Sequence, residues 1–570
     1  MNKRYKILSL LALTALSTRA QDISQIAKSD PLVITGAVGT QNTYYHSSVG
    51  DGYASPLSNS VYANLNISLY GLTMPFTLYY SNDNLDFNYP HFSFNLTPRY
   101  KSWTGHLGRS SMAFSSYVMN MSFNGVGLEY NDGSWRFGGF YGVLRSAVND
   151  DPADPLARNP QYKRVGWGFK VGYGSSRNYI DLYLLKASDR LKSLDEHWQQ
   201  RVSPQENLVV GIKGNVSPTR FLSLTVNAAA SALTTDTRDE AVENDKVERW
   251  DKVFTARTSS MARFAGDASV NLTLPGVSGS VFYRIVQPDY TSMGTYYMAN
   301  NYQGLGVNLS TFLLNRISLS GSFSSQADNL TNKQLYTTRG MVYAANASAR
   351  VTQNLNVALG YNGYTQRQSD GTAKVNDTTR VDRSLQSFTV TPSYLIDGSV
   401  LSHSISLSAS YTENKNRNSF ASGESDVKSF ALGLSYGLGV KPWAIDFVGS
   451  LSHQQSNGYG TKYYSDVASL SASRSFFEEK NLNVSATVSA CYNEVEYTSK
   501  SLSMGFDAAV SYTLAKAHAF SLSASMYKYG DVNVTKTRSG LDVTDITASL
   551  NYTYTFSLIE IKRRTRNIEH

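Results

Sequence analysis

The side chains in this sequence with the greatest catalytic potential are three histidines, His403, His453 and His518, in or beside stretches of alternating residues. Imidazole suits proton transfer near neutral pH, and a hydrolase would need a serine or a carboxylate next to it. Serine is so frequent here that a serine beside a histidine carries little information. The GxGxxG, P-loop, HExxH and CxxC patterns are all missing. We therefore expect no enzyme, no catalytic or cofactor-binding residue and no cofactor.

Two loop-like stretches could bind a ligand. DDPADP (150–155) gathers three aspartates, and carboxylate oxygens suit hard divalent cations. It lacks the regular spacing of an EF-hand, and its two prolines favour a rigid, solvated turn, so we predict no metal site. YTSMGTYYMANNY (290–302) could stack on sugars through its tyrosines, but packing of these rings on the rim of the fold is the preferred interpretation.

Composition and charge restrict the class of protein. Charged residues make up 17% of the 570 residues, hydrophobic residues 41%, and there are 39 Tyr and 41 Gly, which is typical of β structure. The net charge of +8 falls to +4 when the basic residues of the expected signal peptide (Lys3, Arg4, Lys6 and Arg19) are removed. This excess is small and scattered, so nucleic acid is not an expected partner. The single cysteine, Cys491, excludes an internal disulfide.

Strict alternation of apolar and small polar residues is the dominant pattern. In DITASLNYTYTF (545–556), Ile546, Leu550 and Tyr554 belong to the apolar set, while Ser549 and Thr553 belong to the polar set. A strand shows these sets to opposite faces. Ser, Thr, Asn and Gly dominate the polar face here, which suits a lumen better than the charged outer face of a soluble sandwich. By the same parity, His403 and His453 should share the apolar, lipid-facing side.

The links between strands favour a membrane barrel. Short turns such as NDGS (131–134) and SPTR (217–220) alternate with long polar links such as 186–206 and 234–262, and a further long link is expected near 454–464. Short turns on one side and long loops on the other are a property of transmembrane β-barrels. No run after residue 20 approaches the roughly 20 apolar residues of a membrane-spanning helix.

We therefore predict an all-β chain forming a single large antiparallel transmembrane β-barrel. It should have about 26 strands, within a range of about 22 to 28 because residues 72–118 are poorly periodic, with short periplasmic turns and long extracellular loops. The expected divisions are a signal peptide (1–20), a short periplasmic segment (21–31), the barrel (32–558) and a basic periplasmic tail (559–570).

Aromatic residues beside the predicted short turns support this interpretation. A ring of aromatic side chains at the membrane interface is typical of such barrels, although aromatics are also common in strands generally. The residues concerned are Trp135, Phe221, Trp443, Phe476 and Phe477, together with Tyr552, Tyr554 and Phe556 in the last strand.

Four segments carry a family resemblance: YKSWTGHLG (100–108), WRFGGFYGVLRSA (135–147), NYIDLYLLKASD (178–189) and VSPQENLVVGIKG (202–214). With them, residues 30–230 resemble the uncharacterised outer-membrane β-barrel proteins of Bacteroidota that lack a plug domain. The resemblance implies a location in the outer membrane of a Gram-negative bacterium and an association with surface or secreted proteins. It transfers no site residues.

Two functions fit this pattern. The first is a transport-class barrel, a wide conduit or a component of an export system with a polar, uncharged lumen. The alternative is a scaffold that anchors or assembles surface proteins or lipoproteins and moves nothing. The stretch before the first strand is too short for a plug, so either long loops fold inward or another protein fills or covers the lumen. The expected partners are outer-membrane lipid and a lipoprotein or a surface or secreted protein.

Overall fold

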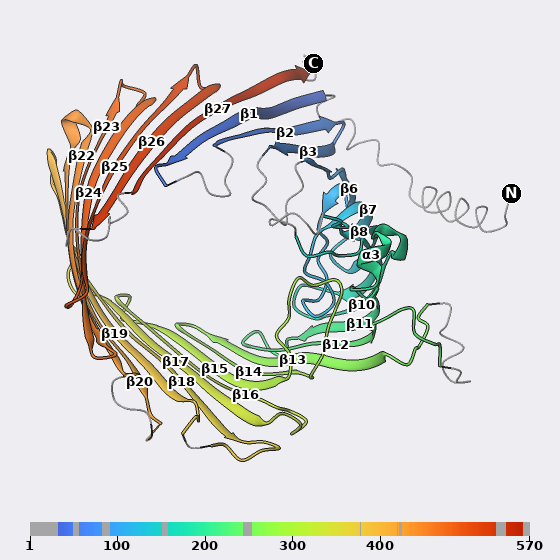
Figure 1. Cartoon of the computed structure of the whole chain (residues 1–570). Helices are drawn as coiled ribbons and strands as arrows, with labels where there is room; N and C mark the ends of the chain where they lie inside the picture. Colours follow the sequence, from blue (N-terminus) through green and yellow to red (C-terminus); the bar gives the residue numbers. More distant parts are fainter. Residues whose placement is uncertain are drawn as a thin grey trace.

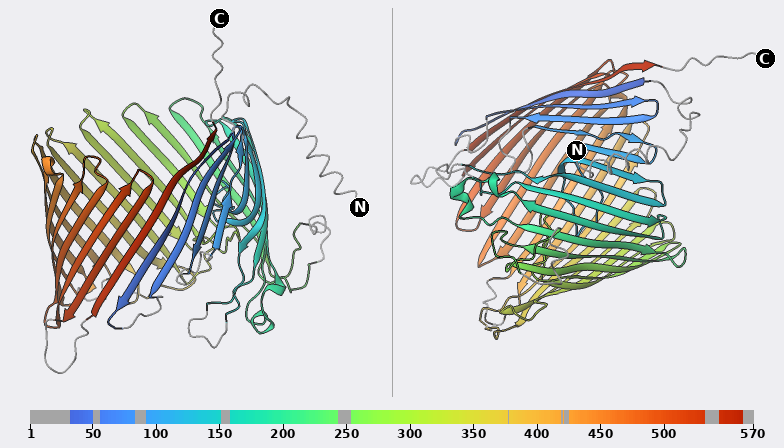
Figure 2. Two further views of the ribbon diagram at one scale, coloured as in Figure 1. Left: turned by 90° about the horizontal axis from the view of Figure 1, so that it is seen from above. Right: turned by 90° about the vertical axis from the view of Figure 1, so that its right-hand side faces the viewer.

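The computed structural model shows a ring of tilted strands that closes on itself (Figure 1). Its first strand begins and its last strand ends at the same rim (Figure 2). The residues that it describes are 32–49, 56–82, 92–150, 158–242, 253–376, 378–418, 420, 425–531 and 543–561.

Among the described residues, strands account for nearly all of the regular structure, with one short α-helix, α3 (Glu196–Gln199), and two single-turn 3₁₀ segments, η1 (Leu191–Ser193) and η4 (Lys441–Trp443). The strands are β1 (Leu32–Ser47), β2 (Leu57–Leu69), β3 (Leu72–Ser81), β4 (Phe92–Leu96), β5 (Arg99–Tyr100), β6 (Trp103–Ser110), β7 (Phe123–Asn131), β8 (Trp135–Arg145), β9 (Arg164–Gly174), β10 (Tyr179–Asp189), β11 (Glu206–Val216), β12 (Leu222–Thr234), β13 (Ser260–Leu274), β14 (Val277–Val286), β15 (Tyr302–Leu313), β16 (Ile317–Asp328), β17 (Tyr336–Arg350), β18 (Leu355–Asp370), β19 (Asp382–Asp397), β20 (Leu401–Asn416), β21 (Val427–Val440), β22 (Ile445–Gly458), β23 (Thr461–Phe476), β24 (Leu482–Val495), β25 (Ser499–Leu514), β26 (His518–Asp531) and β27 (Val543–Ile561).

The predicted strand number is confirmed. β4 and β5 both pair with β3 on one side and β6 on the other, so together they fill one position in the sheet. Pro98 lies between them and has no backbone N–H to donate, which explains the interruption. The barrel therefore has 26 antiparallel strand positions, and β1 pairs with β27 from Leu32↔Ile561 to Ser47↔Asp545 to close it.

Links of two to five residues join the strands at one end of the barrel, which we call the short-turn rim, and most links at the other end, the long-link rim, are longer. The expected long link near 454–464 is wrong. β22 and β23 continue to Gly458 and Thr461, and only Tyr459 and Gly460 connect them. Both have positive φ, 53° and 71°, as the tightest hairpin turns require, so the Asn-Gly-Tyr-Gly stretch forms a turn rather than a loop.

The two faces of the wall follow the expected alternation. Leu434 lies on the outer face, where it stands between Leu407 and Leu451 of the neighbouring strands. Ser435, the next residue, stands on the inner face between Ser406 and Ser450. The same register places Ile546, Leu550 and Tyr554 of β27 outside, and Ser549 and Thr553 inside.

The aromatic residues beside the predicted turns lie at or near the short-turn rim. Trp135 begins β8 and stacks on Phe137 with ring centroids 5.4 Å apart, while Tyr173 of the neighbouring strand lies 4.7 Å away. Trp443 lies in η4, and its side chain is exposed. An aromatic band is thus present at one membrane interface, as transmembrane barrels require.

The chain termini account for the remaining expectations about domains. β27 runs to Ile561, past the expected end of the barrel at residue 558, because β1 supplies pairing partners as far as Leu32. The predicted signal peptide (1–20), the periplasmic segment (21–31) and residues 562–570 of the predicted tail lie outside the described residues. In the part of the chain that the structure describes, no helix is long and apolar enough to cross a membrane.

Replacement of Leu434 by arginine tests the assignment of the two faces. Because this residue stands on the outer face at the middle of β21, Leu434→Arg should lower the free energy of unfolding in lipid vesicles by about 2–4 kcal/mol. Ser435→Arg, one position along and on the inner face, should change it by no more than about 0.5 kcal/mol. Urea titration of the reconstituted proteins measures both values, and equal losses would contradict the assignment.

Candidate functional site: the inner shelf and the facing wall

Two of the long links fold into the barrel and pack against its inner wall (Figure 1). They are residues 111–122, between β6 and β7, and residues 287–301, between β14 and β15, and we call them together the inner shelf. The two links bind each other: the Ser292 hydroxyl donates to the Val118 carbonyl oxygen at 2.5 Å, and the Tyr290 hydroxyl donates to that of Tyr117 at 2.8 Å. The shelf is therefore one interlocked unit.

Side chains of the barrel wall hold residues 111–122 in place. The Ser115 hydroxyl donates to Asn227 Oδ1 of β12 at 2.6 Å, and the Tyr117 hydroxyl donates to Asp267 Oδ1 of β13 at 2.7 Å. The ammonium of Lys170 on β9 donates to the Ala113 carbonyl oxygen at 3.1 Å. The link thus leaves β6 and reaches across the inner face as far as β13.

The link 287–301 is anchored to β11 and β12. The Met293 backbone N–H donates to Asn207 Oδ1 at 2.9 Å, and the Ser231 hydroxyl donates to the Thr291 carbonyl oxygen at 2.6 Å. Burial raises the pKa of the Tyr290 hydroxyl, so this group stays protonated and keeps its bond to the other link.

Beneath the shelf the inner wall is apolar. Inward-facing Tyr183, Leu185, Val209, Ala229 and Ala265 form one buried cluster with Tyr117, Tyr290 and most methionines of the shelf. Gly211 permits the close approach, because a Cβ atom there would lie 2.4 Å from Val118 Cγ2. The barrel therefore has a conventional hydrophobic core, but only on one side of its lumen.

The same side also carries charges, which form pairs on the inner face. His106 Nε2 lies 2.8 Å from Glu129 Oε2, and Lys170 also binds Glu129. Arg136 binds Asp181 through Nε and Nη2 at 2.9 and 2.8 Å. These charges are paired, so they stabilise the wall beneath and beside the shelf rather than giving the lumen a single sign.

The facing wall has a different chemistry. Serines stand side by side on the inner face of successive strands, one on each strand from β19 to β24, and the row consists of Ser393, Ser406, Ser435, Ser450, Ser469 and Ser489. Among the described residues, every hydrophobic side chain classed as buried lies between Met112 and Met293. No described segment is therefore packed against this wall as the shelf is packed against the other.

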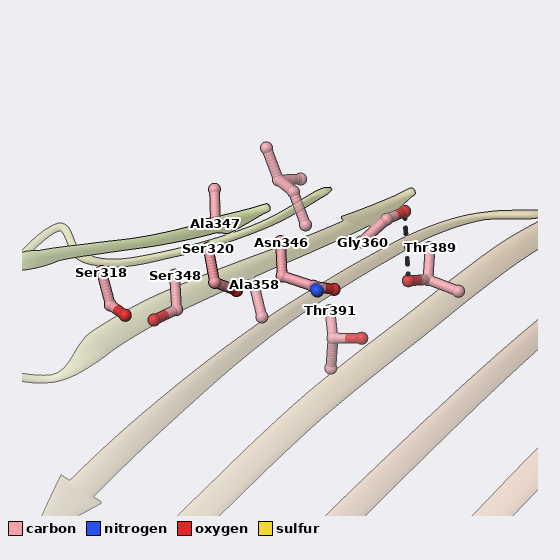
Figure 3. Close-up of a pocket in the computed structure, with 10 residues that line it drawn as sticks. Ser318, Ser320, Asn346, Ala347, Ser348, Ala358, Gly360, Thr389 and Thr391 are labelled. Atoms are coloured by element: carbon pink, nitrogen blue, oxygen red, sulfur yellow. Dashed lines mark hydrogen bonds between the residues drawn. The ribbon is translucent and has the colours of Figure 1, made fainter. Parts of the chain in front are cut away.

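Two adjoining hollows mark the inner surface from β13 to β19, and we call them the hydroxyl trough. Their volumes are about 200 and 410 Å³, and they share Ser320 and Asn346. Figure 3 shows the first hollow, in which Thr389 donates to the Gly360 carbonyl oxygen at 3.4 Å. The inward-facing groups that line the trough are Asn271, Thr273, Ser278, Ser280, Asn308, Ser310, Ser318, Ser320, Ser322, Asn346, Ser348, Ala358, Gly360, Thr389 and Thr391.

The three histidines singled out in the sequence lie on the outer face. His403 and His518 share hydrogen bonds of 2.8 Å with the hydroxyls of Tyr436 and Tyr552. These pairs are near the short-turn rim and extend its aromatic band. Pairing of His403 and His518 with tyrosines gives both imidazoles a structural role in this band.

His453 has a more suggestive partner, because its Nδ1 lies 2.7 Å from Asp466 Oδ1, also on the outer face. Such a pair could orient an imidazole for base catalysis, which additionally requires a nucleophile. The cross-strand neighbours of His453 on this face are Leu432 and Asp466, and the next outward residues along β22 are Leu451 and Gln455. None of these four supplies a hydroxyl or thiol.

The structure describes the two candidate ligand-binding stretches, 150–155 and 290–302, only in part or with differing results. Of DDPADP, residues 151–157 lie outside the described residues, while Asp150 accepts hydrogen bonds from Arg158, which lower the pKa of its carboxyl to about 2. No group of metal ligands occurs in the described part of the chain. In 290–302, Tyr290 packs in the core as preferred, but the side chains of Tyr296 and Tyr297 are exposed.

The shelf segment 111–122 is the part of this site that sequence reasoning missed. Its sequence, SMAFSSYVMNMS, is rich in methionine and contains no charge, unlike the other long links. An apolar link between two strands of a barrel needs a surface to cover it, and that signal could have identified the shelf.

Comparison with known proteins gives only distant structural likenesses. No protein-family profile and no curated protein sequence matches the chain. The P pilus usher PapC translocation pore aligns at 12% identity and a TM-score of 0.34, over 92% of this chain and 99% of that one. OccAB2 of Acinetobacter baumannii aligns at 8% identity and 0.29, over 62% and 92%, and OprD of Pseudomonas aeruginosa at 11% and 0.30, over 73% and 97%.

Because these sequence identities and TM-scores are low, we assign the class of the protein from the geometry of the chain itself. The chain forms a closed antiparallel barrel with exposed leucines and valines on its outer face and an aromatic band at one rim, and closure pairs the strand backbones with one another rather than with water. The chain is a transmembrane β-barrel of the outer-membrane type.

Substitution at Gly211 tests whether the shelf is a packed unit. Gly211→Ala places a methyl group against the fully buried Val118, so the shelf must shift at a cost of about 1–3 kcal/mol. Hydrogen exchange should accelerate in 111–122 and 287–301 and stay unchanged in β20–β25. Gly449→Ala is the matched control, because a Cβ atom there meets nothing within 4 Å. Equal exchange in the two variants would show that the shelf is not held by this contact.

Proposed function

We propose that this chain is a wide conduit in the outer membrane of a Gram-negative bacterium, acting alone or as the channel component of an export system. The observation that carries the proposal is the asymmetry of the lumen. The inner shelf packs on the wall around β7–β14, while the serine row on β19–β24 faces the lumen without a packed partner among the described residues.

The width of the barrel supports a conduit. A round barrel of 26 strands is roughly 50 Å across its backbone, given a strand spacing of about 4.8 Å and a tilt of about 40°. Side chains reach about 5 Å inward from each wall, half the spacing of packed sheets, and leave roughly 40 Å. Neither side chains nor a shelf of two links fills such a space.

The chemistry of the exposed wall suggests the nature of the cargo. Serine, threonine and asparagine donate and accept hydrogen bonds without carrying charge. A lining of these groups suits a polar solute or an extended polypeptide and gives no reason for strong selection between anions and cations. We propose no catalytic role for the chain.

The wider setting is also a proposal. Residues 1–20 would direct export, the family would be that of the plug-less Bacteroidota barrels, and a lipoprotein or a secreted or surface protein would bind at the rim or in the lumen. The scaffold alternative requires the lumen to be filled by such a partner, and so makes the opposite prediction about access to the serine wall.

Cys491 gives a direct probe of that access, since it is the single cysteine and faces inward between Val467 and Ser503. In native outer membranes, a conduit should let Cys491 react with maleimide-linked polyethylene glycol of about 5 kDa. After purification and insertion into planar bilayers, labelled protein should conduct less than unlabelled protein, because the polymer occupies the lumen.

Cys491→Ser, which keeps a small polar side chain, is the control and should be unaffected by the reagent. A thiol that reacts with small maleimides but excludes the polymer in membranes, and reacts with it after purification, would identify a bound partner in the lumen and favour the scaffold. A purified protein that conducts no current would refute the conduit.

A further inference from the structure

The inner shelf holds two aromatic side chains that it does not use for packing. Tyr290, Ser292 and Met293 are at most 2% exposed, whereas Tyr296 is 62% and Tyr297 83% exposed. The link that carries them lies inside the ring of strands (Figure 1). Exposed tyrosine rings within a lumen have a flat apolar face and a hydroxyl available to whatever passes.

The backbone beneath these tyrosines is fixed on both sides. The Tyr296 N–H donates to Asn120 Oδ1 of the other link at 3.3 Å, and three residues earlier Met293 is tied to Asn207 of β11. On the other side, Asn301 Oδ1 accepts the Leu330 N–H at 3.0 Å. The rings are therefore presented by a pre-organised support, which lowers the entropic cost of binding a ligand.

A lane on the inner face of β14 and β15, the strands that this link joins, continues from the shelf. It begins with Arg284, which stands opposite Asp267, and its inward-facing groups beyond Arg284 are uncharged as far as Ser280. The Phe282 ring lies over Gly306, where a Cβ atom would be 2.3 Å from it. Further along, Asn308 Nδ2 donates to Ser280 Oγ at 3.1 Å and marks the entrance to the hydroxyl trough. Aromatic rings thus lead to a surface of hydroxyls and amides.

This sequence of groups matches the chemistry of one ligand class. Sugar rings present C–H faces that stack on aromatic rings and rims of hydroxyls that exchange hydrogen bonds with Ser, Thr and Asn. The residues lining the trough include no charged side chain. An acidic or basic polymer would find no partner there for its charges.

We infer that Tyr296 and Tyr297, with the lane on β14 and β15 and the hydroxyl trough, form a binding path for a neutral oligosaccharide. The inference rests on the proposed conduit, because the ligand must enter the lumen. It names the cargo class that the conduit would hold: a neutral, hydroxyl-rich chain bound first by stacking and then by hydrogen bonds.

The test measures binding of maltoheptaose and cellohexaose to the intact purified protein in detergent, by calorimetry and by saturation-transfer NMR. At least one of the two should bind, with the strongest saturation on its ring C–H protons. Tyr296→Ala/Tyr297→Ala should weaken binding roughly tenfold or more, as expected for two lost stacking contacts. Tyr296→Phe/Tyr297→Phe keeps both rings and should stay within about threefold of the original affinity.

Tyr459→Ala/Tyr497→Ala is the matched control, since these tyrosines are 74% and 99% exposed but lie in tight turns at the long-link rim. It should leave binding unchanged. Circular dichroism checks that each variant keeps its barrel. Absence of binding, equal binding by the alanine variant of Tyr296 and Tyr297, or tighter binding of a neutral Gly-Ser peptide of similar mass would each overturn the inference.

Conductance of the same preparations separates this inference from the proposed function. A protein that conducts but binds no oligosaccharide keeps the conduit and loses the binding path. A protein whose tyrosines bind oligosaccharide but that passes no current keeps the binding path and loses the conduit.

Discussion

Closure of the sheet is the constraint on which the rest of this molecule depends. Inside a bilayer no water can satisfy a free edge strand, so every backbone N–H and C=O must find a partner in the sheet. β1 and β27, separated by nearly the whole chain, meet this requirement by pairing along almost their full lengths. The interrupted strand of β4 and β5 keeps the number of strand positions even, and an even number brings both ends of the barrel to one rim.

Closure at this width creates a second problem, because a large barrel cannot fill its own interior. In the described part of the chain, links cover the inner wall on one side only. Two links fold back onto the inner wall, bury most of their methionines together with Tyr117 and Tyr290 there, and convert part of the lumen surface into a hydrophobic core. Their polar anchors, Asn207, Asn227 and Asp267, stand on three adjacent strands and fix the links in position. On the opposite wall, the serine row of β19–β24 faces the lumen.

This asymmetry determines the wetting and the ion selectivity expected of the proposed conduit. An interior that was apolar throughout would resist wetting, and one with charges of a single sign would select ions. Here the described charges of the shelf side are paired, and the serine row of the facing wall is uncharged. The exposed Tyr296 and Tyr297 stand on the shelf, so the stacking groups and the hydrogen-bonding groups of the proposed path come from different parts of the wall.

The sequence by itself determined the barrel, its strand number and the face to which most side chains point. These features are local: alternation sets the face of each residue, and turn residues set the strand ends. The expected loop near 454–464 shows the limit of this logic, because a polar stretch can extend two strands when Asn-Gly-Tyr-Gly makes a tight turn.

Only the tertiary structure decided what lies inside. Residues 111–122 pack on Asn227 and Asp267, more than a hundred residues away in the chain, and no local pattern records such contacts. Parity placed His453 on the outer face but could not reveal Asp466 beside it, since the cross-strand partner depends on the register of β22 and β23. The same register aligned the serines of successive strands into one row, which alternation within a single strand cannot specify.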